Sequence, residues 1–345
     1  MKRYALTFIG ELPPPYGGVT VKNLLVFQKV FQGFDAQFID LAECKRRPWK
    51  IFEIFYKIVS SMVISRTVVI GVGSTWRRKI LLRMQWMLTG QNGLKKVMLL
   101  VMGGQFHLQV AKDRSLCKLI QQIDSLWVET EKMLYALKKM GIEQTYYFPN
   151  GRDDRGSRPP RVREADSVLK LVFFSRICEE KGVGIIMKAY ETWKMEKVPI
   201  TLDFYGEISD NIKGQFDDFI QKSECIYHGV FDTANRDVYK ELNQYDILLL
   251  PTLCKGEGVP GALIESKMAG ITAIVSELLV NNDVVRNSLE GVVLSQLTAE
   301  ALASTVLALC KSPERVQLLK EGAYESRYRY CIETYRQSLI DHALG

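Results

Sequence analysis

The sequence predicts an α/β protein with two Rossmann-like, doubly wound domains that face each other across a cleft. Its 345 residues exceed the roughly 250–300 residues that a single core usually supports. Short apolar runs alternate with helical patterns, the order expected for parallel strands joined by helices. Between two such series lies a stretch rich in Pro, Arg and Asp, residues 150–167, which is typical of a linker.

The first series opens with an apolar strand, followed by a proline- and glycine-rich loop and a helix. Each later strand is a continuous apolar run, as expected for strands buried on both faces of a parallel sheet. We expect strands at 4–9, 36–40, 67–71, 96–102, 125–128 and 145–148, and helices at about 19–31, 49–64, 76–89 and 130–139.

The second series repeats this order after the linker. It predicts strands at 168–175, 200–205, 224–228, 245–250, 271–276 and 291–294, and a tail that is helical throughout 298–340. We therefore expect an N-terminal domain at 1–152 and a C-terminal domain at 153–324. A C-terminal helix, about 325–345, should pack back on the first domain.

Composition narrows the class of protein. Hydrophobic residues make up 47% of the chain and charged residues 25%, an ordinary globular balance. No apolar run approaches the roughly 18 residues of a membrane span, and the N-terminus is typical of a first strand rather than an export signal. Seven cysteines without a CxxC pair and three scattered histidines indicate a cytoplasmic protein without disulfides, structural zinc or a histidine metal site.

Positive charge is concentrated in the first domain. The net charge is +7, and residues 54–112 contain nine basic residues and no Asp or Glu. Such a region indicates an anionic partner: nucleic acid, a phosphorylated substrate or a membrane surface. No RNP-like motif or zinc finger supports nucleic acid. The segment 75–88, with Trp76 and Trp86, fits an interfacial helix, and it equally fits a packed helix with a solvated basic side.

The stretch KGEGVPGALIESKMAG, residues 255–270, follows an expected strand and therefore lies at the carboxyl edge of a sheet, where such folds bind ligands. We expect Glu257 on the loop and Glu265 in the helix that follows, with Pro260 in its first turn and Gly270 at its end. The segment Gly258, Val259, Pro260, Gly261 offers close backbone approach and free N–H groups to a phosphate. A glycine-rich turn with a solvated Glu265 is the alternative.

Three further loops follow strands. The loop SRICEEKG, 175–182, carries Arg176 and Lys181, which suit a diphosphate but also fit surface cations. The loop ELPPPYGGV places Gly17 and Gly18 before a helix, and it matches neither GxGxxG nor the P-loop pattern. In VMGGQFH, Gly103 and Gly104 precede His107, which fits a substrate contact or a structural histidine.

Taken together in this order, the loops resemble those of retaining GT-B glycosyltransferases of family GT4, two-domain cytoplasmic enzymes that use nucleotide sugars. The segment EGVPGALIESKMAG matches the family's E-x7-E pattern, and SRICEEKG resembles its loop with a closing Lys-Gly. PPYGGV resembles the N-terminal glycine loop, and ETEKMLYALKKMGI with YYFPNG resembles the end of the first domain. The departures are Ser175, Ser266 and Met102, the last in a place where relatives carry His or Arg.

The resemblance implies a role for each candidate residue. Arg176 and Lys181 are expected to bind the donor diphosphate and stabilise the leaving group, and Glu257 to lie near the transferred sugar. Glu265 is expected to accept hydrogen bonds from the ribose. Donor-binding residues are expected to be Gly17, Gly18, Gly258, Val259, Pro260, Gly261 and Glu265, and acceptor- or sugar-side residues Gly103, Gly104 and His107.

The resemblance also implies the partners. The donor is a UDP- or GDP-sugar, with UDP favoured, used as a co-substrate without metal or other cofactor. The acceptor is a further inference: the basic first domain suits a lipid-linked or oligosaccharide glycan of a bacterial surface polysaccharide, and we expect a cytoplasmic enzyme, peripheral on the inner membrane face. Two alternatives stay open: a catalytically inert GT-B-fold binding subunit and a nucleotide-sugar epimerase.

Overall fold

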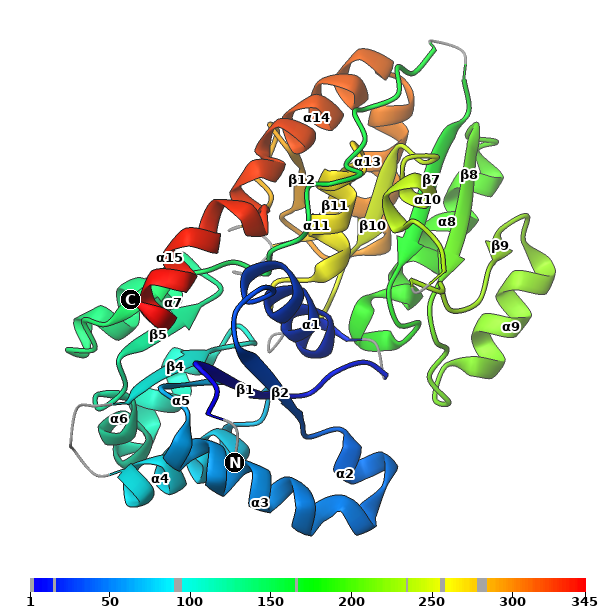
Figure 1. The fold of residues 1–345 in the computed structure, drawn as a ribbon. Helices are drawn as coiled ribbons and strands as arrows, with labels where there is room; N and C mark the ends of the chain where they lie inside the picture. The colour runs from blue at the N-terminus through cyan, green and yellow to red at the C-terminus, as the bar shows by residue number, and fades with distance from the viewer. Residues whose placement is uncertain are drawn as a thin grey trace. The chain divides into compact units, whose positions relative to one another are not determined.

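The structure is a computed structural model (Figure 1). It describes residues 3–14, 17–89, 95–164, 167–233, 235–254, 258–277 and 284–345. The contacts divide the chain into two compact units, which we describe separately. Unit 1 comprises Met1–Asp153, Gly256–Val259 and Tyr330–Gly345, and unit 2 comprises Asp154–Lys255 and Pro260–Arg329.

Unit 1 is built on a parallel sheet of six strands in the order β2-β1-β3-β4-β5-β6. The central strands are rich in Val, Ile and Leu, and β1 and β3 are buried along their whole length, which explains their continuous apolar runs. The strands are β1 (Leu6–Gly10), β2 (Ala36–Asp40), β3 (Thr67–Gly71), β4 (Lys96–Leu100), β5 (Ser125–Val128) and β6 (Thr145–Tyr147).

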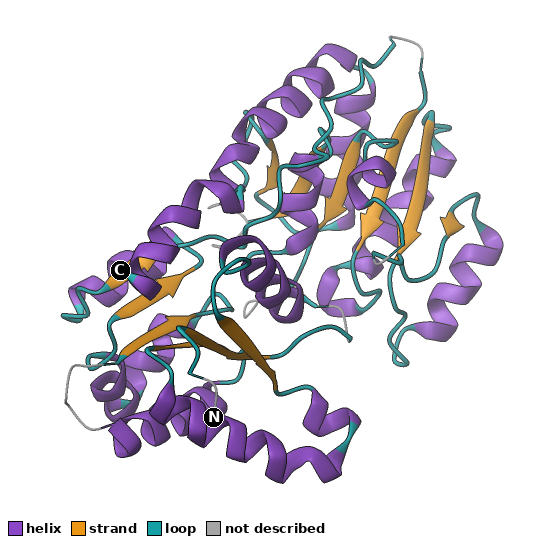
Figure 2. Ribbon diagram, in the orientation of Figure 1, coloured by secondary structure: helices purple, strands orange, loops and turns teal. Residues whose placement is uncertain are grey.

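Helices cover both faces of this sheet, as the layers in Figure 2 show. On one face α1 (Gly18–Val30) packs against α15 (Ile332–Leu344), and both contribute to a core with Phe8 and Val69. The other face carries a second core, covered by helices that follow β2 to β5. These elements are α2 (Glu43–Arg46), η1 (Pro48–Lys50), α3 (Ile51–Ile64), α4 (Thr75–Thr89), α5 (Phe106–Lys112), α6 (Arg114–Ile120) and α7 (Glu131–Lys139).

Unit 2 repeats the plan with a parallel sheet in the order β12-β11-β10-β7-β8-β9. Helices α8 and α13 pack together over its main core. The strands are β7 (Leu169–Phe174), β8 (Ile200–Tyr205), β9 (Ile226–Tyr227), β10 (Ile247–Leu250), β11 (Thr272–Ser276) and β12 (Gly291–Leu294). The helices include η2 (Glu179–Lys181), α8 (Val183–Met195), α9 (Lys213–Lys222), α10 (Val238–Leu242), α11 (Gly261–Met268), α13 (Ala299–Cys310), α14 (Pro313–Glu325) and η3 (Ser326–Tyr330).

The prediction of two doubly wound α/β domains is confirmed, with one local correction. The tail is not helical throughout, because the helix breaks before Pro313 and again at Cys331, where the backbone is extended. At the start of the predicted linker, Asn150 and Arg152 are buried, and the Arg152 N–H donates to the Tyr330 carbonyl at 2.8 Å, so this stretch pairs with the returning C-terminal segment of unit 1.

Candidate functional site

In unit 2, hydrogen bonds join the segments that follow three neighbouring strands. The carbonyl of Glu180, in the loop after β7, accepts hydrogen bonds from Leu253 N–H at 2.8 Å and from Thr252 Oγ1 at 3.0 Å, both in the loop after β10. The Ser276 hydroxyl at the end of β11 donates to the Thr252 carbonyl at 2.7 Å. The carboxyl ends of β7, β10 and β11 therefore form one connected edge, the part of such a sheet that binds ligands.

Arg176 and Lys181 both lie on this edge. The Arg176 side chain is 56% exposed, and its guanidinium lies 3.7 Å from the Glu180 carboxylate, a loose ion pair that leaves the cation able to turn toward a ligand. Lys181 ends η2, immediately before Gly182. Gly182 has φ 79°, and a Cβ there would lie 2.0 Å from the Pro251 carbonyl oxygen, so only glycine allows α8 to start this close to the end of β10.

Helix α11 carries Glu265, the second carboxylate of the E-x7-E pattern, in its second turn, where the residue is half-buried. The helix begins at Gly261, so Pro260 is its N-cap residue rather than a member of the first turn as expected from the sequence. The Pro260 side chain makes no capping hydrogen bond at this end. Gly270, with φ 66°, ends the helix, and Ile271 N–H donates back to the Ser266 carbonyl at 3.0 Å. Glu257 lies outside the described residues.

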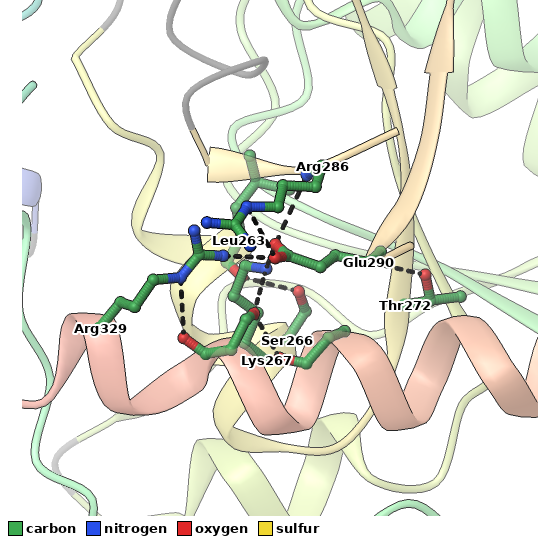
Figure 3. A network of polar contacts seen from close by, with 9 residues as sticks. Leu263, Ser266, Lys267, Thr272, Arg286, Glu290 and Arg329 are labelled. Carbon is green, nitrogen blue, oxygen red and sulfur yellow. Dashed lines mark hydrogen bonds and ion pairs between the residues drawn. The ribbon is translucent and has the colours of Figure 1, made fainter. Parts of the chain in front are cut away.

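A buried polar network anchors α11 (Figure 3). Lys267 Nζ donates to Glu290 at 2.7 Å and to the Ser326 hydroxyl at 2.8 Å, and both Lys267 and Glu290 are almost fully buried. The guanidiniums of Arg286 and Arg329 also pair with the Glu290 carboxylate. Burial lowers the pKa of Lys267 to about 8, and the Glu290 carboxylate opposes this shift. The network joins α11 to the turn before β12 and to the end of α14, which fixes the helix that carries Glu265.

In unit 1 the glycine loops also lie at the carboxyl edge of the sheet. Gly17 is the N-cap residue of α1, and Gly103 follows β4 with φ 107°. A Cβ added to Gly17, Gly18 or Gly103 would meet no atom within 4 Å in the part of the chain that the structure describes. Packing within the protein therefore does not require a missing side chain at Gly17 or Gly18, whereas close approach of a ligand would.

A buried ion pair links these two loops. Lys22 Nζ, in the second turn of α1, donates to Glu129 Oε1 at 2.8 Å, and Gly103 N–H donates to Glu129 Oε2 at 3.1 Å. Lys22 is 1% exposed and Glu129 4%. Burial lowers the pKa of the Lys22 ammonium, and the Glu129 carboxylate acts against that shift. Glu129 therefore ties the start of α1 to the loop after β4.

Gly258 joins the same cluster, since residues 258 and 259 belong to unit 1. Asn150 Nδ2 donates to the Val259 carbonyl at 2.8 Å. A Cβ on Gly258 would lie 3.0 Å from Gly103 Cα and 3.2 Å from Glu129 Oε2. The structure thus brings Gly103 and Gly258 together. Sequence reasoning missed Lys22 and Glu129, because nothing local marks either as buried.

Arg78 and His107 complete the polar groups at this edge. Arg78 is 1% exposed and donates at 2.8 Å to the carbonyls of Val72 and Met102, so it holds the loops after β3 and β4. Burial lowers its pKa to about 10, and this residue does not belong to the basic surface in which the sequence analysis counted it. His107 on α5 is buried, its Nδ1 has no hydrogen-bond partner among the described residues, and burial lowers its pKa.

Neither a metal cluster nor a membrane-spanning helix occurs among the described residues. Within the ranges that the structure covers, no three His, Cys, Asp or Glu side chains gather as a metal site would require. In the same ranges, every helix is too short or too polar to cross a bilayer.

Comparison with known proteins identifies part of the chain. Residues 157–326 match the family model "Glycosyl transferases group 1". Over 147 residues the chain is 26% identical to the amylovoran biosynthesis glycosyltransferase AmsK of Erwinia amylovora, a match that covers 41% of this chain. The matched region spans 36% of the length of that relative.

Solved structures resemble the whole chain. HepE of Anabaena in complex with UDP superimposes with a TM-score of 0.75 at 12% identity, covering 97% of this chain and 98% of HepE. Sucrose-phosphate synthase of Thermosynechococcus elongatus gives 0.72 at 13% identity, covering 98% of both chains. The chain therefore has the GT-B fold of these structures, and residues 157–326 are similar to the glycosyltransferase group 1 family.

Proposed function

We propose that the protein is a retaining, metal-independent glycosyltransferase of the GT4 type. It transfers a hexosyl group from a UDP-sugar, favoured over a GDP-sugar, to a lipid-linked glycan in the synthesis of a bacterial surface polysaccharide. The observation that carries the proposal is the connected edge of unit 2, where Arg176, Lys181 and the start of α11 follow neighbouring strands within the matched group 1 domain. The complexes of HepE with UDP and with UDP-glucose support the donor class. The role of AmsK in amylovoran biosynthesis supports the product class.

The donor diphosphate is bound by cations and backbone N–H groups. Arg176 is exposed and only loosely paired, so its guanidinium can exchange the Glu180 carboxylate for phosphate oxygens. Lys181 adds a second positive charge on the same loop. The N-terminus of α11, where the N-cap residue Pro260 makes no side-chain hydrogen bond, offers its N–H groups to the same diphosphate, and Glu265 accepts hydrogen bonds from the ribose hydroxyls.

The transfer step needs charge stabilisation more than a protein nucleophile. The acceptor hydroxyl oxygen forms a bond to the anomeric carbon as the bond from that carbon to the diphosphate oxygen breaks. The electron pair leaves with the nucleoside diphosphate, and the hydroxyl proton passes to the departing phosphate on the same face. Arg176 and Lys181 stabilise the negative charge that develops there. Glu257, outside the described residues, is assigned to the sugar.

Gly17 and Gly18 of unit 1 leave open space at the start of α1, which we assign to the donor phosphates. The rest of the unit 1 edge is assigned to the acceptor side, where Glu129 accepts a hydrogen bond from the Gly103 N–H in the loop after β4. His107 is buried and its pKa is lowered, so its imidazole is neutral at pH 7. A neutral imidazole can donate a hydrogen bond to a sugar hydroxyl or accept one from it.

The test is turnover of a panel of UDP- and GDP-sugars with extracted polyprenyl-diphosphate-linked glycans, read as nucleoside diphosphate release and as labelled lipid product. Arg176→Ala and Lys181→Ala should each lower the rate by about 10²–10³-fold, as loss of one oxyanion-stabilising group does. Lys188→Ala, an exposed lysine on α8, is the matched control and should keep full rate. Donor binding without turnover would favour an inert binding subunit. Conversion of the donor sugar to its epimer without acceptor would favour an epimerase.

A further inference from the structure

One surface of unit 1 exposes large aromatic side chains. On η1 and the first turns of α3, Trp49 is 74% exposed, Phe52 82% and Phe55 56%. Soluble domains rarely gather such side chains on one surface, and contiguous exposed apolar patches usually mark a binding surface. The sequence predicts a helix at about 49–64 here and assigns it no function.

Helix α3 carries a second apolar stripe beside the one that packs into the core. Ile54, Ile58 and Met62 pack into the core beneath the helix. Positions 52, 55, 56, 59 and 63 follow the three- and four-residue spacing of a single helix face, and they carry Phe, Phe, Tyr, Val and Val. A surface helix of a soluble domain normally carries polar residues on its outer face. This outer stripe lies about 115° around the helix from the inner one, and its Phe and Tyr side chains are exposed rather than covered by the core.

Helix α4 extends the same surface. Trp76 is 68% exposed and Met87 76%, whereas Leu81 and Leu82 are buried in the core that also takes the inner stripe of α3. The two helices contact each other and cover one face of one sheet, as Figure 1 shows. Their outer faces therefore point away from the sheet on the same side, and we call them together the α3–α4 surface.

Positive charge surrounds this surface. Residues 40–89 contain ten Lys or Arg and three Asp or Glu. Arg78 is buried, and Lys45, Arg77 and Lys79 pair with Glu11 and Asp113 outside this range, so nine cations face five carboxylates and a positive surplus remains. A surface with this charge repels a second copy of itself and attracts a surface of opposite sign.

We propose that the α3–α4 surface docks unit 1 onto an anionic lipid bilayer. Trp49, Phe52 and Phe55 enter the interface between headgroups and acyl chains, the depth that aromatic side chains prefer, and the surrounding Lys and Arg face the headgroups. The inference rests on the proposed function, because a lipid-linked acceptor is held in such a bilayer. It assigns the main contact with the bilayer to α3. The sequence suggested an interfacial helix only at 75–88, which is α4.

The test is co-sedimentation of the full chain with vesicles made of phosphatidylglycerol and phosphatidylcholine in equal amounts, compared with phosphatidylcholine alone. The variant is Phe52→Ser with Phe55→Ser. The matched control is Met195→Ser with Leu318→Ser, two apolar side chains of unit 2 that are 76% and 58% exposed. Because all four side chains are exposed, both variants should keep the wild-type circular dichroism spectrum and melting temperature.

We expect wild type and control to bind the anionic vesicles and the Phe52/Phe55 variant to bind at least about tenfold more weakly. Equal binding of all three proteins, equal binding to neutral vesicles, or no vesicle binding would overturn the proposal. A concentration-dependent dimer lost in the Phe52/Phe55 variant, without vesicle binding, would assign the surface to a second copy instead. Stabilisation by UDP is measured on the same preparations, so failure to bind vesicles is distinguishable from failure of the donor site.

Discussion

Removal of the Glu129 carboxylate should destabilise unit 1 strongly. In Glu129→Leu the Lys22 ammonium stays buried, and its remaining contacts among the described residues are the Phe148 carbonyl at 3.4 Å and the Phe148 ring, 4.6 Å from its centroid. The Gly103 N–H loses its acceptor as well. Breaking a buried pair by removing one partner costs about 3–5 kcal/mol, because an uncompensated charge remains inside. For a unit of this size that corresponds to a fall in melting temperature of roughly 6–20 °C.

The assay is urea unfolding followed by tryptophan fluorescence, which reports chiefly on unit 1 because Trp49, Trp76, Trp86 and Trp127 lie there and only Trp193 lies in unit 2. The double variant Lys22→Met with Glu129→Leu removes both charges. It should regain most of the lost stability, since an apolar pair can replace a buried ion pair at little cost. Glu53→Gln, which breaks the exposed pair with Lys57, should change the midpoint little.

Two results would refute this reasoning. If Glu129→Leu unfolded at the wild-type urea concentration, Lys22 would not depend on Glu129 in the folded protein. If the double variant were no more stable than Glu129→Leu, the loss would arise from packing rather than from the unpaired charge.

Two further predictions concern backbone geometry and pH. Gly182→Ala should lower the melting temperature, because the new Cβ overlaps the Pro251 carbonyl. Gly18→Ala should leave the melting temperature unchanged and weaken UDP binding. Calorimetry that finds a lower melting temperature for Gly18→Ala than for Gly182→Ala would contradict both assignments. Hydrogen bonds from Lys79 and from Leu116 N–H lower the pKa of Asp113 to about 2 from 3.8, so its stabilisation is present above about pH 4 and is lost as pH falls toward 2. The difference in melting temperature between wild type and Asp113→Asn should shrink across that window, and a difference independent of pH would be inconsistent with it.

The sequence predicts the strands well because their patterns are local. β2, β3, β5, β8 and β12 occupy the expected residues, since each is an apolar run flanked by polar or turn residues. The division of α5 from α6 at Asp113 was not predicted. There the carboxylate accepts from Ser115 and Leu116 N–H and starts a new helix, a capping signal that is easily overlooked between two short apolar segments.

The buried charges could not be predicted in the same way. Lys22 and Glu129 are 107 positions apart, and only the parallel order of β1, β3, β4 and β5 brings α1 next to the residue that follows β5. A single lysine on a helix is usually solvated, so its sequence neighbours gave no reason to bury it. Arg78 is a similar case, because its acceptors are two loop carbonyls that follow different strands. The sequence of α3 also does not show which of its two apolar stripes is buried, and the structure shows that the outer one is exposed.

The central claim is that unit 2 binds a nucleoside diphosphate through the edge that includes Glu265, and calorimetric titration of UDP and GDP tests it most directly. We expect UDP to bind wild type more tightly than GDP does. Glu265→Ala should lose about 10- to 100-fold in UDP affinity, the value of a hydrogen bond to a charged group, while the control Glu191→Ala, an exposed carboxylate on α8, should bind as wild type does. No binding of either nucleotide to wild type, or equal UDP affinity in Glu265→Ala, would contradict the account.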